Sequence, residues 1–384
     1  MAAAASSTPP VSLVCGDDDF GVKQRARAIY QQWCNELGGM DHEIIDAAVN
    51  NSSEALRAMA KLREALQTLP FFGGGKVIWF QSCNFLDDDR TARAKDVAAT
   101  LGEIAQELKS FRWDGVRLII SAGKVDKRKS LPKALEKLGS VEVFTALSLG
   151  DKDWADRAES AAAKQIRALK KNISPEALAQ LVTLVGPNLR DLANEVEKLT
   201  LYVGDRTDIK LTDVVAVVTR HKHARAFALA DAVGNRDLPR VLRTLDAELW
   251  EIKTGSDKDK SEIGLLYGVT AKVRSMLFLR EMIAAGWVKP DADYGRFKSQ
   301  LESVPADAFA KDRKFNPLAM HPFSLHNSLP QARRYSQAEL VRAMDLLLQA
   351  NRRLVSSRLD GAMILQQTLT EIVSRNETTT PARA

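Results

Sequence analysis

The chain has 384 residues, of which 45% are hydrophobic and 27% are charged, and its formal net charge is +6. This composition is typical of a globular protein with buried cores, and the length allows two or three domains. No run reaches the roughly 18 apolar residues of a transmembrane helix, so no membrane contact is predicted. The mildly basic balance favours a polyanionic partner.

The two ends of the chain, 1–10 and 376–384, are predicted to be disordered tails. Residues 1–10 lack the basic and apolar regions of a signal or transit peptide. The three cysteines, Cys15, Cys34 and Cys83, are far apart and odd in number, which favours a reducing cytoplasm over a disulfide framework. Neither the cysteines nor the histidines form a ligand pattern, so no metal is predicted.

Short apolar strands alternate with helical patterns over residues 11–150, which predicts a mostly parallel sheet covered by helices. The strands are expected at 11–15, 43–46, 77–80, 116–121 and 141–144, and the helices at 20–37, 53–69 and 90–111. Asp17, Asp18 and Asp19 follow the first strand, where a nucleotide-binding domain places its phosphate loop. Three carboxylates would repel a phosphate, so we expect them to cap the next helix instead.

The turn between the second helix and the third strand holds Leu69, Phe71 and Phe72 beside a proline and three glycines. The two rings either fold back into the core or form a hydrophobic wedge that enters a partner's pocket. The segment Gly73–Lys76 looks like the end of a phosphate-binding loop. However, Val77 stands where that motif requires serine or threonine, and a strand follows instead of a helix, so a nucleotide site is rejected.

A basic segment follows the strand at 116–121. It has two interpretations: a solvated helix face, or a surface that contacts DNA phosphates without reading sequence. Its candidate DNA-binding residues are Lys124, Lys127, Arg128, Lys129 and Lys133.

From residue 151 the pattern predicts helices only, in two groups. A small module over 151–219 is expected to hold helices at 152–171, 175–186, 188–202 and 212–219, with Ser174 and Thr212 as caps. A larger domain over 220–375 is expected to hold helices at 226–233, 238–252, 263–285, 337–359 and 362–375. Residues 253–262 are expected to form a solvated loop, and 287–335, which contains five prolines, is expected to be irregular.

Several motifs in this order resemble the delta subunit of the bacterial DNA polymerase III clamp loader. The resemblance extends from about residue 11 to residue 375. It is carried by Gly16-Asp-Asp-Asp-Phe20, Leu69-Pro-Phe-Phe72, Lys127-Arg-Lys-Ser-Leu-Pro-Lys133, the run from Leu189 to Tyr202, Phe227-Ala-Leu-Ala-Asp-Ala232, His321-Pro-Phe323 and Tyr335-Ser336.

This resemblance implies an AAA+-like α/β domain without ATP binding over 11–150, an all-α lid over 151–219 and an all-α collar over 220–375. It also implies that Leu69, Phe71 and Phe72 bind the sliding clamp (beta) and open its ring. The other partners it implies are the tau/gamma and delta prime subunits, contacted through the collar, and primed DNA. No cofactor is implied, and ATP would be bound by neighbouring subunits.

Two other functions remain open from the residues. An active AAA+ ATPase would need a phosphate loop and an acidic magnesium motif after an apolar strand, and neither Ser121 nor Gln81 supplies such an acid. A helical scaffold that binds no clamp would differ only in whether Phe71 and Phe72 bind a partner. Catalysis by this chain itself is not expected, and polymerase chemistry would belong to the whole complex.

Overall fold

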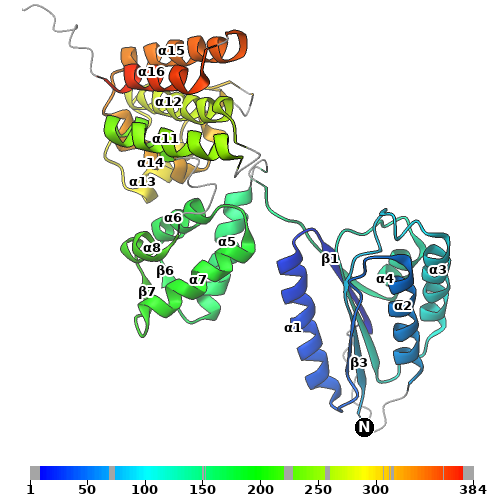
Figure 1. The fold of residues 1–384 in the computed structure, drawn as a ribbon. Coiled ribbons are helices and arrows are strands. Elements are labelled where there is room, and N and C mark those ends of the chain that lie inside the picture. Colours follow the sequence, from blue (N-terminus) through cyan, green and yellow to red (C-terminus); the bar gives the residue numbers. More distant parts are fainter. Residues whose placement is uncertain are drawn as a thin grey trace, which may run out of the picture. The chain divides into compact units, whose positions relative to one another are not determined.

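The computed structural model describes residues 9–68, 74–148, 151, 153–219, 228–255, 260–305, 307–310, 312, 315–357 and 359–374. The chain divides into two compact units, Met1–Ser148 and Leu149–Ala384 (Figure 1). The predicted wedge residues Leu69, Phe71 and Phe72 lie outside the described residues. The predicted division of the second unit at residue 219 stays a prediction.

The first unit contains a five-stranded sheet in the order β2-β3-β4-β1-β5. Its strands are β1 (Val11–Gly16), β2 (Glu43–Asp46), β3 (Lys76–Cys83), β4 (Val116–Ala122) and β5 (Gly139–Phe144). Every neighbouring pair runs parallel, which confirms the predicted sheet. The helices are α1 (Asp19–Leu37), α2 (Ser52–Gln67), α3 (Lys95–Ser110) and α4 (Ser130–Leu138).

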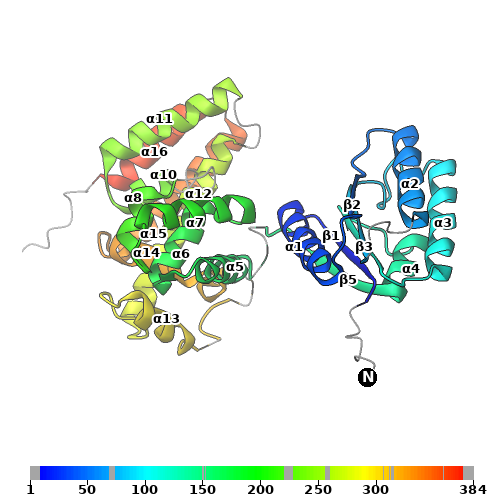
Figure 2. The same cartoon turned by 90° about the horizontal axis from the view of Figure 1, so that it is seen from below.

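The sheet has helices on both faces, with α1 on one side and α2, α3 and α4 on the other (Figure 2). Val14, Trp79 and Ile119 pack with α1, whereas their strand neighbours Leu13 and Ile78 pack with the other three helices. Because successive side chains of a strand point to opposite faces, burial on both faces requires the continuous apolar runs seen in the sequence.

The third helix begins at Lys95, five residues after the predicted start at 90. Two aspartates in the preceding turn hold the chain in another conformation. Asp89 accepts a hydrogen bond of 2.6 Å from the backbone N–H of Ala92, and Asp88 forms an ion pair of 2.7 Å with Arg93. Short acidic side chains that bond to nearby backbone compete in this way with helix formation.

The second unit is almost entirely helical, as predicted for residues after 151. Its first part holds α5 (Trp154–Ala168), α6 (Pro175–Val185), α7 (Leu189–Val203) and α8 (Leu211–Val217), with two-residue strands β6 (Asn172–Ile173) and β7 (Asp208–Ile209). Its second part holds α10 (Ala228–Gly234), α11 (Leu238–Thr254), α12 (Glu262–Ala284), α13 (Tyr294–Glu302), η2 (Pro317–Ala319), α14 (Pro322–Ala332), α15 (Gln337–Ser356) and α16 (Gly361–Val373).

Two predictions in the second unit were wrong. The stretch 287–335 was expected to be irregular, but it holds helices α13 and α14. Asp293 caps α13. Pro322 occupies the first turn of α14, where a backbone N–H would have no partner within the helix, so the proline does not prevent the helix. The cap of α8 is not Thr212: the helix begins at Leu211, and the Asp213 carboxylate accepts a hydrogen bond of 2.9 Å from the N–H of Lys210.

Among the described residues, no helix is long and apolar enough to span a membrane.

Candidate functional site

One buried lysine joins the residues on either side of the segment 69–73, which holds the predicted wedge residues. Helix α2 ends at Gln67, and Lys76 begins β3. The Lys76 ammonium donates a hydrogen bond of 3.4 Å to the carbonyl oxygen of Thr68, and it lies 2.7 Å from a carboxylate oxygen of Glu43. Its side chain is only 1% exposed. Lys76 therefore ties Thr68 to the start of β3, on either side of the segment 69–73, and we call Thr68 and residues 74–76 the loop neck.

Two glycines of the loop neck are required by close backbone approach. Gly74 has a φ of +81°, and a Cβ there would lie 2.9 Å from the backbone nitrogen of Gly39. A Cβ at Gly75 would lie 2.6 Å from the carbonyl oxygen of Gly115. The N–H of Gly75 also donates to the carbonyl oxygen of Leu37 at 3.1 Å. Gly74 and Gly75 thus allow tight backbone packing at the start of β3.

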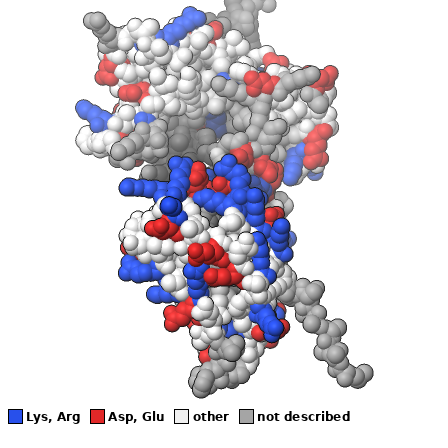
Figure 3. Space-filling model, turned by 90° about the vertical axis from the view of Figure 1, so that its right-hand side faces the viewer, with Lys and Arg blue, Asp and Glu red and all other residues white. Residues whose placement is uncertain are grey.

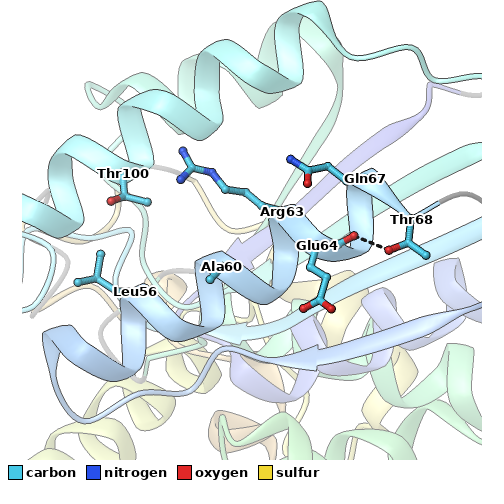
Figure 4. A pocket seen from close by; sticks show the side chains of 7 residues that line it. All are labelled: Leu56, Ala60, Arg63, Glu64, Gln67, Thr68 and Thr100. Atoms are coloured by element: carbon cyan, nitrogen blue, oxygen red, sulfur yellow. Dashed lines mark hydrogen bonds between the residues drawn. The ribbon is translucent and has the colours of Figure 1, made fainter.

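A surface groove between α2 and α3 leads to the loop neck. One pocket of about 500 Å³ is lined by Leu56, Ala60, Arg63, Glu64, Gln67, Thr68 and Thr100 (Figure 4). A second pocket of about 310 Å³ shares Arg63 and Gln67 with the first and continues to Phe111 and Arg112. Arg63 joins the two helices through ion pairs of 2.8 Å to Glu103 and 2.9 Å to Glu107. The groove reaches Thr68, the last described residue before the predicted wedge residues.

The loop between β1 and α1 has its carboxylates engaged with the protein backbone. Asp18 caps α1 by accepting a hydrogen bond of 3.1 Å from the N–H of Gly21, as the sequence predicted. Asp17 accepts one of 2.8 Å from the N–H of Ala146 and lies 3.5 Å from the Lys124 ammonium. The Ala146 hydrogen bond, with a smaller contribution from Lys124, holds the pKa of Asp17 below its usual value. This negatively charged loop does not suit a phosphate group.

The predicted DNA-binding residues follow β4, and several of them have acidic or backbone partners. Lys124 pairs with Asp17, Arg128 pairs with Asp126 at 2.9 Å, and Lys129 donates a hydrogen bond of 2.6 Å to the carbonyl oxygen of Asp87. In Figure 3, which looks onto the first unit, lysine and arginine side chains gather at one end with acidic side chains among them.

The remaining two candidates, Lys127 and Lys133, have exposed side chains. Lys133 lies on α4, and Lys127 lies in the turn before it. These two lysines are therefore the members of the segment best placed to contact a phosphate.

Sequence reasoning missed the role of Lys76 and its partner Glu43. It treated Lys76 only as the end of a rejected phosphate motif. The available signal was weak: a lysine at the start of an apolar strand, with an acid at the start of the strand before it. Only the pairing of β2 with β3 brings the two side chains together.

The sequence is similar to those of bacterial DNA polymerase III delta subunits. A family model described as "DNA polymerase III, delta subunit" matches residues 13–145. The DNA polymerase III subunit delta of Bacillus subtilis is 24% identical over 316 residues, which cover 82% of this chain and 80% of the relative. The probable DNA polymerase III subunit delta of Aquifex aeolicus is 26% identical over 187 residues, which cover 48% of this chain and 51% of that relative.

A solved structure, the Bacillus subtilis DNA clamp loader delta protein, aligns over 96% of both chains at 20% identity with a TM-score of 0.44. The resemblance to bacterial delta subunits that the sequence motifs indicated is confirmed by the family and sequence matches.

Proposed function

We propose that this chain acts as the delta subunit of a DNA polymerase III clamp loader. In this role it binds the sliding clamp through Leu69, Phe71 and Phe72 and opens the clamp ring for loading on primed DNA. The observation that carries the proposal is the family match over 13–145, a range that includes all three wedge residues. The lysine-tied loop neck supports it, because a loop with fixed ends loses less conformational entropy when it binds.

In this mechanism the chain catalyses no reaction, and the free energy of its binding to the clamp opens the ring. Burying each of the three apolar side chains in a clamp pocket would contribute about 1.5–3 kcal/mol. A ligand shifts an equilibrium only by its preference for one state, so the wedge opens the ring if its binding pocket is better formed in the open clamp. ATP bound by neighbouring subunits would then control access to the wedge.

The partners follow from the same proposal. Residues 220–375 would contact the tau/gamma and delta prime subunits as a helical collar, and the whole complex would carry the polymerase chemistry in the cytoplasm. Primed DNA would pass near the segment after β4. Lys127 and Lys133 would then contribute contacts to phosphates, which depend on salt and not on sequence.

The test is binding of the purified chain to the sliding clamp of the same organism, measured for the wild type and for a Phe71→Ala, Phe72→Ala double variant. Loss of two buried rings should weaken binding by about 100-fold or more, since each 1.4 kcal/mol is a factor of ten. A Trp250→Ala variant, which removes an exposed aromatic ring of the second unit, is the matched control and should bind like the wild type.

Two other outcomes would change the proposed clamp-binding site or the proposed function. Tight binding that survives in the double variant would place the clamp contact elsewhere on the first unit. If neither the wild type nor the double variant binds the clamp, the scaffold function becomes the better explanation.

A further inference from the structure

Three chemically versatile side chains meet within the second unit. Asp156 and Glu159 lie one turn apart on α5, so both project from the same side of that helix. His321 is the residue that immediately precedes α14. One ligand atom from each of the three residues can be chosen so that all lie within 4.8 Å of one another.

The closest pair in this cluster is unusual. The Nε2 atom of His321 lies 3.2 Å from Oε1 of Glu159, and both side chains are mostly buried. That buried carboxylate oxygen nevertheless accepts no hydrogen bond from the residues that the structure describes. When the imidazole is neutral and its Nε2 presents a lone pair, the two atoms repel each other, and a cation between them would then satisfy both.

The cluster is partly shielded from water, since the side chains of His321 and Glu159 are mostly buried. Tyr294, at the start of α13, packs edge to face on Phe323 of α14 with ring centroids 5.1 Å apart. The pKa of Tyr294 is raised to about 12, first by burial and then by the charges of Glu159 and Asp156. Packing of this ring on Phe323 places an apolar group beside the first turn of α14, which follows His321.

We propose that Asp156, Glu159 and His321 bind one divalent transition-metal ion of the zinc class. Carboxylate and imidazole are common zinc ligands, and ligands about 2.1 Å from a tetrahedral ion lie about 3.4 Å apart. The pair formed by His321 and Glu159 already has nearly that spacing. Asp156 is exposed, so its side chain can rotate to complete a three-ligand site, and a water molecule would take the fourth position.

A bound ion would join α5 to α14 within the second unit. Asp156 and Glu159 belong to the predicted lid, residues 151–219, and His321 belongs to the predicted collar. The ion would therefore restrain movement between these two groups of helices. This inference does not rest on the proposed clamp-loading function.

The experiment is a titration of the full-length chain, freed of metal by chelation, with Zn²⁺ and separately with Mg²⁺. Isothermal titration calorimetry should give one strong Zn²⁺ site per chain and a zinc-dependent rise in Tm. Mg²⁺ should give neither, because imidazole is a poor ligand for it. Asp156→Asn and His321→Gln should each weaken Zn²⁺ binding by about tenfold or more, since even loss of an outer partner has that effect on metal sites.

The controls are His326→Gln, a half-buried histidine on α14, and Asp205→Asn, an exposed acid of the predicted lid. Both should bind Zn²⁺ like the wild type. Three results would overturn the proposal: no Zn²⁺ binding at millimolar concentration, binding that is unchanged in both ligand variants, or an equal loss of binding in the controls. Thermal unfolding of each metal-free variant shows whether it is folded, and Glu159→Gln provides a further ligand variant if one of the others is not.

Discussion

The ammonium of Lys76 lies 2.7 Å from a carboxylate oxygen of Glu43, and the two partners differ greatly in exposure. The lysine side chain is 1% exposed, whereas that of the glutamate is 44% exposed. Loss of the lysine leaves a carboxylate that water can still solvate. Loss of the glutamate charge leaves a buried ammonium whose one remaining partner among the residues that the structure describes is the carbonyl of Thr68.

Substitution of Glu43 should therefore lower the free energy of unfolding more than substitution of Lys76. We expect Glu43→Gln to lower the free energy of unfolding by about 3 kcal/mol or more, as for other buried charges that lose their partner. Lys76→Met should cost less, about 1–2 kcal/mol, because it removes hydrogen bonds but keeps the apolar stem. Urea denaturation of each variant measures the difference. Glu103→Gln, at an exposed ion pair on α3, should change stability by less than about 1 kcal/mol. A larger loss for Lys76→Met than for Glu43→Gln would contradict this explanation.

Arg236 binds the end of helix α16, and we expect a lysine at this position to stabilise the fold less than the arginine does. Its guanidinium donates hydrogen bonds to the carbonyl oxygens of Val373 at 3.1 Å and Arg334 at 2.9 Å, and it also pairs with Glu339. A lysine lacks this planar set of donors. Arg236→Lys should lower the free energy of unfolding by about 1–3 kcal/mol in urea denaturation.

The contribution of Arg236 to the free energy of unfolding should also depend on pH. The hydrogen bond from Arg236 is the largest cause that lowers the pKa of Glu339. A carboxylate with a lowered pKa stabilises the fold above the pKa it has when unfolded, and this stabilisation is lost as the pH falls through the lowered value. The stability difference between wild type and Arg236→Lys should therefore narrow in acid. Arg342→Lys, at an exposed pair with Glu371, is the control and should show little effect at any pH.

Contact between the first unit and DNA can be tested through salt dependence. In the assembled clamp loader, a Lys127→Ala, Lys133→Ala double variant should reduce the slope of log affinity for primed DNA against log salt by about 2, since each phosphate contact contributes about 0.9. A Lys61→Ala, Lys109→Ala double variant removes the same charge from exposed positions on α2 and α3. Equal slopes for the two double variants would mean that the segment after β4 is a solvated surface that does not contact DNA.

The free cysteines should react in an order set by burial. Burial raises the pKa of Cys83 to about 12 and also raises the pKa values of Cys15 and Cys34. Because the thiolate is the reactive form, all three should react slowly at pH 8 in the folded chain. Cys34 is only half-buried, so iodoacetamide labelling followed by mass spectrometry should detect it first. Labelling of Cys83 before Cys34 without denaturant would contradict the burial described here.

Much of the fold could be predicted from local sequence. The apolar runs of β1 and β4 predicted a sheet buried on both faces, and Asp18 and Ser174 were correctly expected to cap helices. These features depend on residues within one or two turns of each other, so a linear pattern contains them. Local patterns failed at α3 and α14, where aspartates in a turn delayed one helix and a proline in the first turn allowed another.

Tertiary structure decided which distant side chains meet. Glu43 reaches Lys76 because β2 pairs with β3, and His321 reaches Glu159 because α14 packs within the same unit as α5. The sequence by itself determined the apolar wedge as a candidate site, since adjacent phenylalanines in a glycine-rich turn need no fold to be noticed. The buried ion pair and the three-ligand cluster could not be noticed in that way. Their chemistry depends on distances of a few ångströms between segments far apart in the chain, and no local periodicity encodes those distances.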